Sequence, residues 1–143
     1  MNMRRGSSGA LPYGKAQPCT MRNMELSYIN LFVSDLGQAV RFYSETLGFE
    51  LLFEDADFGY ASFQTGPVRL AVAATDDEAL VGRHTGIGFA VEDLIAAHQA
   101  LAEKGVEFSS PPQKQPWGGF MATLLDPDGN SFYLDQVDLK AHA

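Results

Sequence analysis

The sequence predicts an α+β fold of two tandem βαβββ units, which form a cupped, partly closed mixed β-sheet barrel with the helices outside. Three observations support this prediction: strands with period-two alternation, helices with polar caps and glycine stops, and an internal repeat. Val33-Ser34-Asp35-Leu36 is followed by Val91-Glu92-Asp93-Leu94, with Asp93 lying 58 residues after Asp35. A repeat of this length indicates a duplicated supersecondary unit.

The chain of 143 residues is long enough for one domain with its own core. We expect residues 1–23 to be a disordered arm or an appended segment, because they are rich in Gly, Ser, Pro and Arg without apolar periodicity. The domain is expected to span 24–143, with unit one at about 24–76 and unit two at about 84–137. A mostly polar connection from Thr75 to His84 joins them.

Unit one is predicted to begin with a strand from Tyr28 to Val33, followed by a helix that Asp35 caps and Gly48 ends. The strand's alternation puts aliphatic residues on one face and aromatic or amide residues on the other. The remaining strands are predicted at Phe49 to Phe53, Gly59 to Gln64 and Val68 to Ala73.

Unit two repeats this order, with a strand from Ile87 to Val91 and a helix between Asp93 and Gly105. A Pro-rich loop is expected from Ser109 to Gly119, and a tight turn at Asp126 to Gly129. The other strands of this unit are predicted at Val106 to Phe108, Phe120 to Leu125 and Ser131 to Gln136.

The charge is unevenly distributed. Four of the ten basic residues precede Met24 and no acid does, so the remaining six basic and eighteen acidic residues leave a net charge of −12. Such a surface repels nucleic acid and attracts cationic small molecules. No apolar run approaches the roughly 20 residues of a membrane span. The single cysteine, Cys19, closes no intrachain disulfide, so a cytoplasmic protein is expected.

Several short motifs occur in a distinctive order between about Met24 and Val137. Beside the repeated Val-x-Asp-Leu junction they are Phe42-Tyr43, Leu47-Gly48-Phe49, Gly105-Val106, Pro116-Trp117-Gly118-Gly119 and Asp126-Pro127-Asp128-Gly129-Asn130. Together they resemble the vicinal oxygen chelate superfamily, which includes glyoxalase I, extradiol dioxygenases and fosfomycin- and bleomycin-resistance proteins. The resemblance implies a homodimer and a ligand cup built within one chain or across two.

Enzymes of that superfamily hold a divalent metal with His, Gln or Glu at four strand positions. The resemblance places these positions at Tyr28, Ala71, Gly86 and Tyr133. Alanine and glycine have no donor, and neutral tyrosine is a poor ligand. His84 and His142 are expected in a connection and a tail, and His98 in the second helix away from the cup. We therefore predict no metal and no cofactor, and assign no catalytic residue.

The concave face is predicted to combine large rings with small side chains, which suits a planar or extended ligand. Trp117 is expected at the mouth, where it either stacks on the ligand or plugs the edge of the core. Arg69 is expected either to orient an anionic group or to pair with Asp135. The residues predicted to bind the ligand are Tyr28, Asn30, Phe32, Arg69, Ala71, Gly86, Trp117, Tyr133 and Asp135.

Three functions follow from this pattern. The first is a metal-independent protein similar to the bleomycin-resistance branch that sequesters an aromatic or cationic small molecule. The second is a metal-dependent lyase or dioxygenase with other ligands. The third is a structural or regulatory dimer whose own side chains fill the cup.

Overall fold

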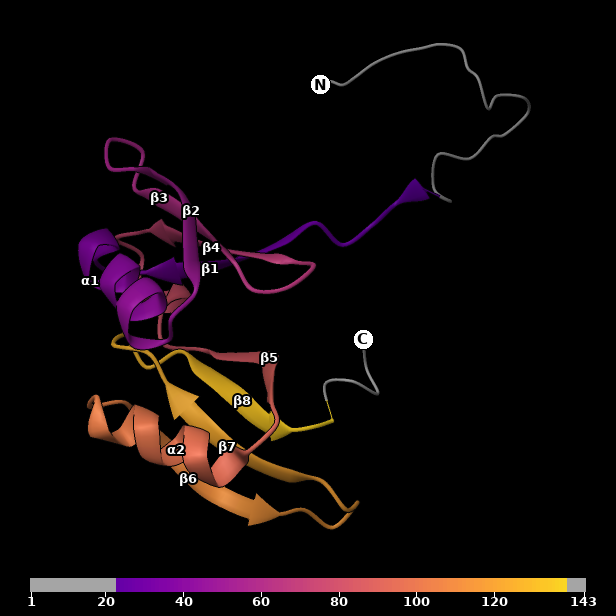
Figure 1. Cartoon of the computed structure of the whole chain (residues 1–143). Coiled ribbons are helices and arrows are strands. Elements are labelled where there is room, and N and C mark those ends of the chain that lie inside the picture. The colour runs from indigo at the N-terminus through magenta and orange to yellow at the C-terminus, as the bar shows by residue number, and fades with distance from the viewer. Residues whose placement is uncertain (1–22, 139–143) are drawn as a thin grey trace, which may run out of the picture.

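A computed structural model describes residues 23–138, so the predictions for residues 1–22, including Cys19, and for His142 lie outside the described residues. It contains two units of matching topology, one above the other in Figure 1. Unit one comprises β1 (Tyr28–Val33), α1 (Leu36–Arg41), η3 (Phe42–Thr46), β2 (Glu50–Asp55), β3 (Tyr60–Gln64) and β4 (Arg69–Ala74). After η4 (Glu78–Leu80), unit two comprises β5 (His84–Val91), α2 (Leu94–Glu103), β6 (Glu107–Lys114), β7 (Phe120–Leu125) and β8 (Ser131–Gln136).

Each unit forms one four-stranded mixed sheet, in the orders β1-β4-β3-β2 and β5-β8-β7-β6. The first and last strands of each unit pair in parallel, and the other pairs are antiparallel. The predicted duplication is therefore confirmed. The described strands form two separate sheets, and no closed barrel is found among them.

The helix starts and stops follow the local signals in the sequence. Asp35 accepts a hydrogen bond from the backbone N–H of Gln38, and Asp93 accepts one from Ala96. These bonds satisfy amides that have no partner within the helix. Gly48 and Gly105 follow the helices with φ values of +83° and +94°, a left-handed conformation that favours glycine.

The first helix changes form halfway along its length. After Arg41 it continues as a π-helix, in which Leu47 N–H donates to the carbonyl of Phe42, five residues earlier, at 2.9 Å. Phe42 and Tyr43 are the buried residues of this turn. Hydrophobic spacing alone does not predict this wider π-helical turn.

The core is shared by both units. Tyr43 from η3 lies 5.7 Å from Phe63 of β3 and 6.1 Å from Phe132 of β8, measured between ring centres. Phe132 also stacks on Phe89 of β5 at 5.1 Å. Burial of large apolar side chains stabilises a fold by about 1.5–3 kcal/mol each, so this shared core joins the units into one body.

Two predicted boundaries are wrong in unit two. β5 begins at His84 rather than Ile87, and β6 continues to Lys114 through the segment expected to be a loop. β6 is the edge strand of its sheet, and its ladder shifts register on both sides of Ser110. Edge strands and bulges tolerate proline, so Pro111 and Pro112 do not end this strand.

Candidate functional site

The face of β1 opposite the core is open. Leu31 and Val33 are buried, whereas Tyr28 and Phe32 are 54% and 37% exposed. Asn30 lies between them, half-buried. The predicted alternation of β1 is therefore correct.

Arg69 lies next to Tyr28 in the parallel ladder of β1 and β4. Its guanidinium carbon is 5.9 Å from the centre of the Tyr28 ring, and a guanidinium nitrogen is 3.4 Å from Ser27 Oγ. The pair with Asp135 that the sequence left open is not among these contacts. Ala71, on the same strand, is fully buried opposite Asn30.

A cavity of about 380 Å³ lies on the second sheet. It is formed by β6, the loop after it, β7 and β8, and it brings together Trp117 and Tyr133, two of the predicted ligand residues. None of the side chains that line it from the described residues is charged. The lining consists of Ser110, Gln113, Gln115, Trp117, Met121, Thr123 and Tyr133.

Most of this lining was not predicted as a site. Met121 and Thr123 alternate along β7 with Ala122 and Leu124, which are buried in the core. Alternate residues of a strand share a face, so this period-two pattern is the sequence signal that places Met121 and Thr123 on the face away from the core. Ser110 and Gln113 carry no such signal, because they lie in the Pro-rich segment from Ser109 to Gly119 that the sequence predicts to be a loop.

A bulge in β5 changes which residue faces the site. Asn30 pairs with Ala71 in unit one, and Gly88 pairs with Tyr133 at the matching place in unit two. Two residues earlier on β4, Arg69 pairs with Tyr28. On β8, Ser131 lies two residues before Tyr133 and pairs with His84. On β5, however, His84 lies four residues before Gly88 rather than two.

The bulge therefore contains two extra residues, and Gly86 within it has a φ of +73°. Counting seven residues back from Asp93 placed the ladder position at Gly86. That interpretation is corrected here, because the ladder position matching Tyr28 is occupied by His84. The expectation that His84 lies in a connection is also wrong, since it is the first residue of β5.

His84 is hydrogen-bonded through both ring nitrogens. Nδ1 lies 2.7 Å from Ser131 Oγ, and Nε2 lies 2.9 Å from Tyr133 Oη. The His84 and Tyr133 rings meet edge to face at 5.0 Å. Tyr133 lines the 380 Å³ cavity, so the hydrogen bond to its hydroxyl group connects His84 with a residue of that cavity.

The pairing of β1 with β4 and of β5 with β8 locates the four predicted metal-ligand positions. With the bulge taken into account they are Tyr28, Ala71, His84 and Tyr133. This set holds one imidazole, two phenols and a methyl group, which does not fit a divalent-metal centre. Across residues 23–138 no cluster of three or more His, Cys, Asp or Glu side chains could hold a metal ion. His98 contacts Phe108 instead, at 4.5 Å between ring centres.

A second hollow, of about 210 Å³, lies where β1 and β5 approach each other. Asn30 and Phe32 line it from unit one, and His84 and Arg83 from the start of unit two. Of the predicted residues, Tyr28, Arg69, Ala71, Gly86 and Asp135 line neither this hollow nor the 380 Å³ cavity.

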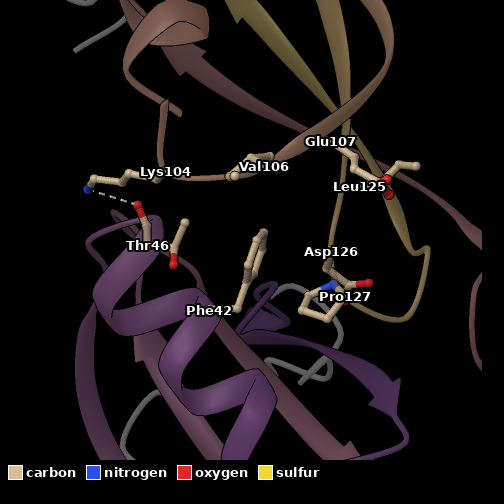
Figure 2. A pocket seen from close by; sticks show the side chains of 9 residues that line it. Phe42, Thr46, Lys104, Val106, Glu107, Leu125, Asp126 and Pro127 are labelled. Carbon is tan, nitrogen blue, oxygen red and sulfur yellow. Dashed lines mark hydrogen bonds between the residues drawn. The ribbon is translucent and has the colours of Figure 1, made fainter. Parts of the chain in front are cut away.

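A third hollow, of about 290 Å³, lies where the π-helical turn of unit one meets unit two (Figure 2). Its surface combines the Phe42 ring with Val106, Leu125 and Pro127. Lys104 Nζ donates to the carbonyl of Thr46 across its edge. It lies between the two units and contains none of the predicted ligand residues, so we assign no ligand to it.

The turn between β7 and β8 connects the units through hydrogen bonds. Tyr43 Oη donates to Asp126 Oδ2 at 2.7 Å. Asn130 Nδ2 donates to the carbonyl of Phe32, and its Oδ1 accepts from Gly82 and Arg83 N–H at 2.9 and 3.0 Å. The tight turn predicted here is thus also a contact between the units, and its residues line the 210 Å³ and 290 Å³ hollows.

The helices in the described part of the chain are all too short or too polar to cross a membrane.

Comparison with known proteins gives consistent matches. The profile of the glyoxalase/bleomycin resistance protein/dioxygenase superfamily matches residues 25–134. A bleomycin resistance protein from Klebsiella pneumoniae is 31% identical over 119 residues, which is 78% of this chain and 92% of that protein.

Two solved structures illustrate the similarity of fold. A member of the same superfamily from Sphaerobacter thermophilus DSM 20745 is 30% identical with a TM-score of 0.67, covering 80% of this chain and 98% of that one. TnmS3, an antibiotic binding protein from Streptomyces sp. CB03234, is 28% identical with a TM-score of 0.70, covering 80% and 97% of the two chains.

Proposed function

Because the chain belongs to the glyoxalase/bleomycin resistance protein/dioxygenase superfamily, we propose that it is a small-molecule-binding member that sequesters a planar aromatic compound without a metal. The observation that carries this proposal is the 380 Å³ cavity lined by Trp117, Tyr133 and Met121. Its volume lies within the roughly 300–1,000 Å³ range of small-ligand sites.

The lining favours an aromatic ligand. Trp117 is 72% exposed, so its indole face is available for stacking. Met121 offers a polarisable thioether, which contacts rings favourably. Ser110, Gln113 and Thr123 supply neutral hydrogen-bonding groups that can fix the orientation of a ligand.

The choice between aromatic and cationic ligands depends on local charge. The overall acidity of the chain favours a cation, but no carboxylate of the described residues lines the 380 Å³ cavity or the hollow beside β1. A cation in either place would lose hydration without gaining an ion pair. We therefore propose an aromatic rather than a cationic ligand.

Metal independence is supported by the donor set at the four ladder positions, where His84 is the only imidazole and its two nitrogens already have partners. A metal-dependent lyase or dioxygenase would need several carboxylate or imidazole ligands, and these four positions supply one. Two of the relatives above are described as bleomycin resistance and antibiotic binding proteins, which agrees with a sequestering role.

The experiment uses Trp117, the single tryptophan of the chain, as the reporter. Its fluorescence would be titrated with naphthalene, quinoline and anthraquinone carboxamides, using protein dialysed against EDTA. Saturable quenching at one ligand per site is expected, and Met121→Ala should weaken it while Met24→Ala, outside the cavity, should not. Absence of binding throughout the panel would contradict the proposal. Stoichiometric Zn, Ni, Mn or Fe in undialysed protein would instead favour the metal-dependent enzyme.

We also propose that the protein is a homodimer. The edge strand β2 exposes Leu51, Leu52 and Phe53 at 38%, 43% and 52%. An apolar exposed edge is suited to association with another chain. Light scattering after size exclusion should give twice the chain mass, and Leu52→Lys should shift it toward the monomer. A monomeric mass for the unmodified protein would contradict this proposal.

A further inference from the structure

The two hollows beside Tyr133 and His84 are neighbours. Tyr133 lines the 380 Å³ cavity and His84 lines the 210 Å³ hollow, while a 2.9 Å hydrogen bond joins their side chains. A ligand stacked near Trp117 could therefore extend past Tyr133 toward the second hollow. The chemistry of that hollow then decides what the extended part of the ligand is.

Arg83 is the charged residue that lines the second hollow. Its main chain is fixed, because its N–H donates to Asn130 Oδ1 at 3.0 Å and its carbonyl accepts from Ser131 N–H at 3.1 Å. Within residues 23–138, its exposed guanidinium makes one hydrogen bond, at 3.4 Å to the carbonyl of Ala79. None of the carboxylates in residues 23–138 pairs with it, so most of its donors remain available.

His84 and Tyr133 add further donor capacity. When the proton of the imidazole is on Nε2, that nitrogen donates to Tyr133 Oη, and the phenolic O–H is left to donate to a ligand. Asn130 and Asn30 also line the second hollow, and none of the acidic residues within 23–138 does. Although the chain has a net charge of −8, the donors that line this hollow suit it to an anion rather than a cation.

We propose that the ligand is an aromatic acid, with its ring system toward Trp117 and its carboxylate, or a similar anionic group, toward the guanidinium of Arg83 and the hydroxyl of Tyr133, which His84 holds in place. This inference rests on the proposed function, because it assigns the chemical class of the sequestered compound. Arginine is the appropriate residue for this task, since its planar guanidinium binds carboxylates with two parallel hydrogen bonds.

The test compares three probes on one scaffold by isothermal titration calorimetry: 2-naphthoate, 2-naphthamide and 2-(aminomethyl)naphthalene. The same comparison would be made with the corresponding anthracene compounds. The carboxylate is expected to bind about tenfold more tightly than the amide, which is the effect of one charge-assisted hydrogen bond, and the amine more weakly than both.

Arg83→Gln should remove the tenfold preference for 2-naphthoate while leaving 2-naphthamide binding unchanged, and Arg83→Lys should restore part of it. Arg41→Gln is the matched control, because Arg41 lies on α1, outside both hollows, and its loss changes the net charge equally. Circular dichroism of each variant checks that the fold is intact.

The outcomes separate the two proposals. Equal binding of amide and carboxylate, or a preference that survives in Arg83→Gln, would overturn the assignment of an aromatic acid and leave the sequestering function standing. Failure of every probe on both scaffolds to bind would overturn the proposed function itself, and the assignment with it.

Discussion

Tyr43 donates a 2.7 Å hydrogen bond from its Oη to Oδ2 of Asp126, although the two residues are 83 positions apart and belong to different units. Both side chains are buried. Asp126 also accepts from the backbone N–H groups of Asp128 and Asn130 and from Asn130 Nδ2. The carboxylate is thus fully hydrogen-bonded, and the bond from Tyr43 fastens η3 to the turn between β7 and β8.

Removing this bond should destabilise the protein without altering its fold. Tyr43→Phe keeps the ring in the core but takes one donor from a buried carboxylate, which should cost about 1.5–3 kcal/mol of the free energy of unfolding. Urea denaturation measures this change. Tyr60→Phe is the matched control, because no hydrogen bond of the Tyr60 hydroxyl is found within residues 23–138 and the expected change is within about 0.5 kcal/mol. Equal losses in both variants would contradict the assignment.

The same bond predicts how stability depends on alkaline pH. Burial raises the pKa of Tyr43 far above its ordinary value, and the negative charge of Asp126 and the hydrogen bond to it raise this pKa further. The folded state therefore favours the neutral phenol. This contribution is fully present below the unfolded pKa of about 10 and is lost as the pH rises above it.

The free energy of unfolding should therefore fall more steeply above about pH 10 in the unmodified protein than in Tyr43→Phe. The two proteins differ only in the Tyr43 hydroxyl, so the difference between the two curves isolates its contribution. Parallel curves from pH 8 to pH 11 would show that Tyr43 does not contribute in this way.

Asn130 should be more important to stability than Ser34, although both join the units. Asn130→Ala would leave the N–H groups of Gly82 and Arg83 short of a partner in a part-buried place and a carboxylate oxygen of Asp126 short of one in a buried place, at a cost of at least about 2 kcal/mol. Ser34 Oγ donates to Asp128 at an exposed place, so Ser34→Ala should cost less than about 1 kcal/mol. Thermal unfolding of both variants tests the order, and the reverse order would contradict it.

The bulge in β5 should depend on Gly86. Its φ of +73° strains any residue with a side chain, so Gly86→Ala should cost about 1–2 kcal/mol, even though nothing lies within 4 Å of the added carbon. Gly88→Ala is the control, since its φ is ordinary and the added carbon would lie 3.7 Å from Tyr133 Cβ, an ordinary contact.

The His84 imidazole signals in an NMR spectrum report on the bulge directly. They should shift strongly in Gly86→Ala, because relaxing the bulge moves His84 away from Ser131 and Tyr133. They should shift little in Gly88→Ala. Unchanged His84 signals in Gly86→Ala would show that the bulge does not depend on this glycine.

Much of the fold could be predicted because its signals are local. The caps at Asp35 and Asp93 are contacts across three residues, and the glycine stops are properties of single residues. Period-two alternation in β1 follows from the geometry of one strand. The repeat then places these local signals twice in one chain, and this was sufficient to predict the order of elements and the superfamily.

The candidate site could be predicted only in part. Of the residues predicted to bind a ligand, Trp117 and Tyr133 line the 380 Å³ cavity, and Asn30 and Phe32 line the 210 Å³ hollow, while ligand binding by them stays a prediction. Ser110 and Gln113 were missed because two prolines conceal the edge strand β6. His84 was missed because a count along the chain assumes that no strand contains a bulge.

The sequence by itself determined the duplicated βαβββ units, the helix boundaries and the absence of usual metal ligands at Tyr28 and Ala71, since each depends on residue identity and short-range geometry. Only the tertiary structure decided that His84 stands beside Tyr133, that Arg83 lines the adjoining hollow, and that Asp126 and Asn130 join the units. These relationships depend on ladder register and on hydrogen bonds between residues 47 to 98 positions apart, which no local pattern encodes.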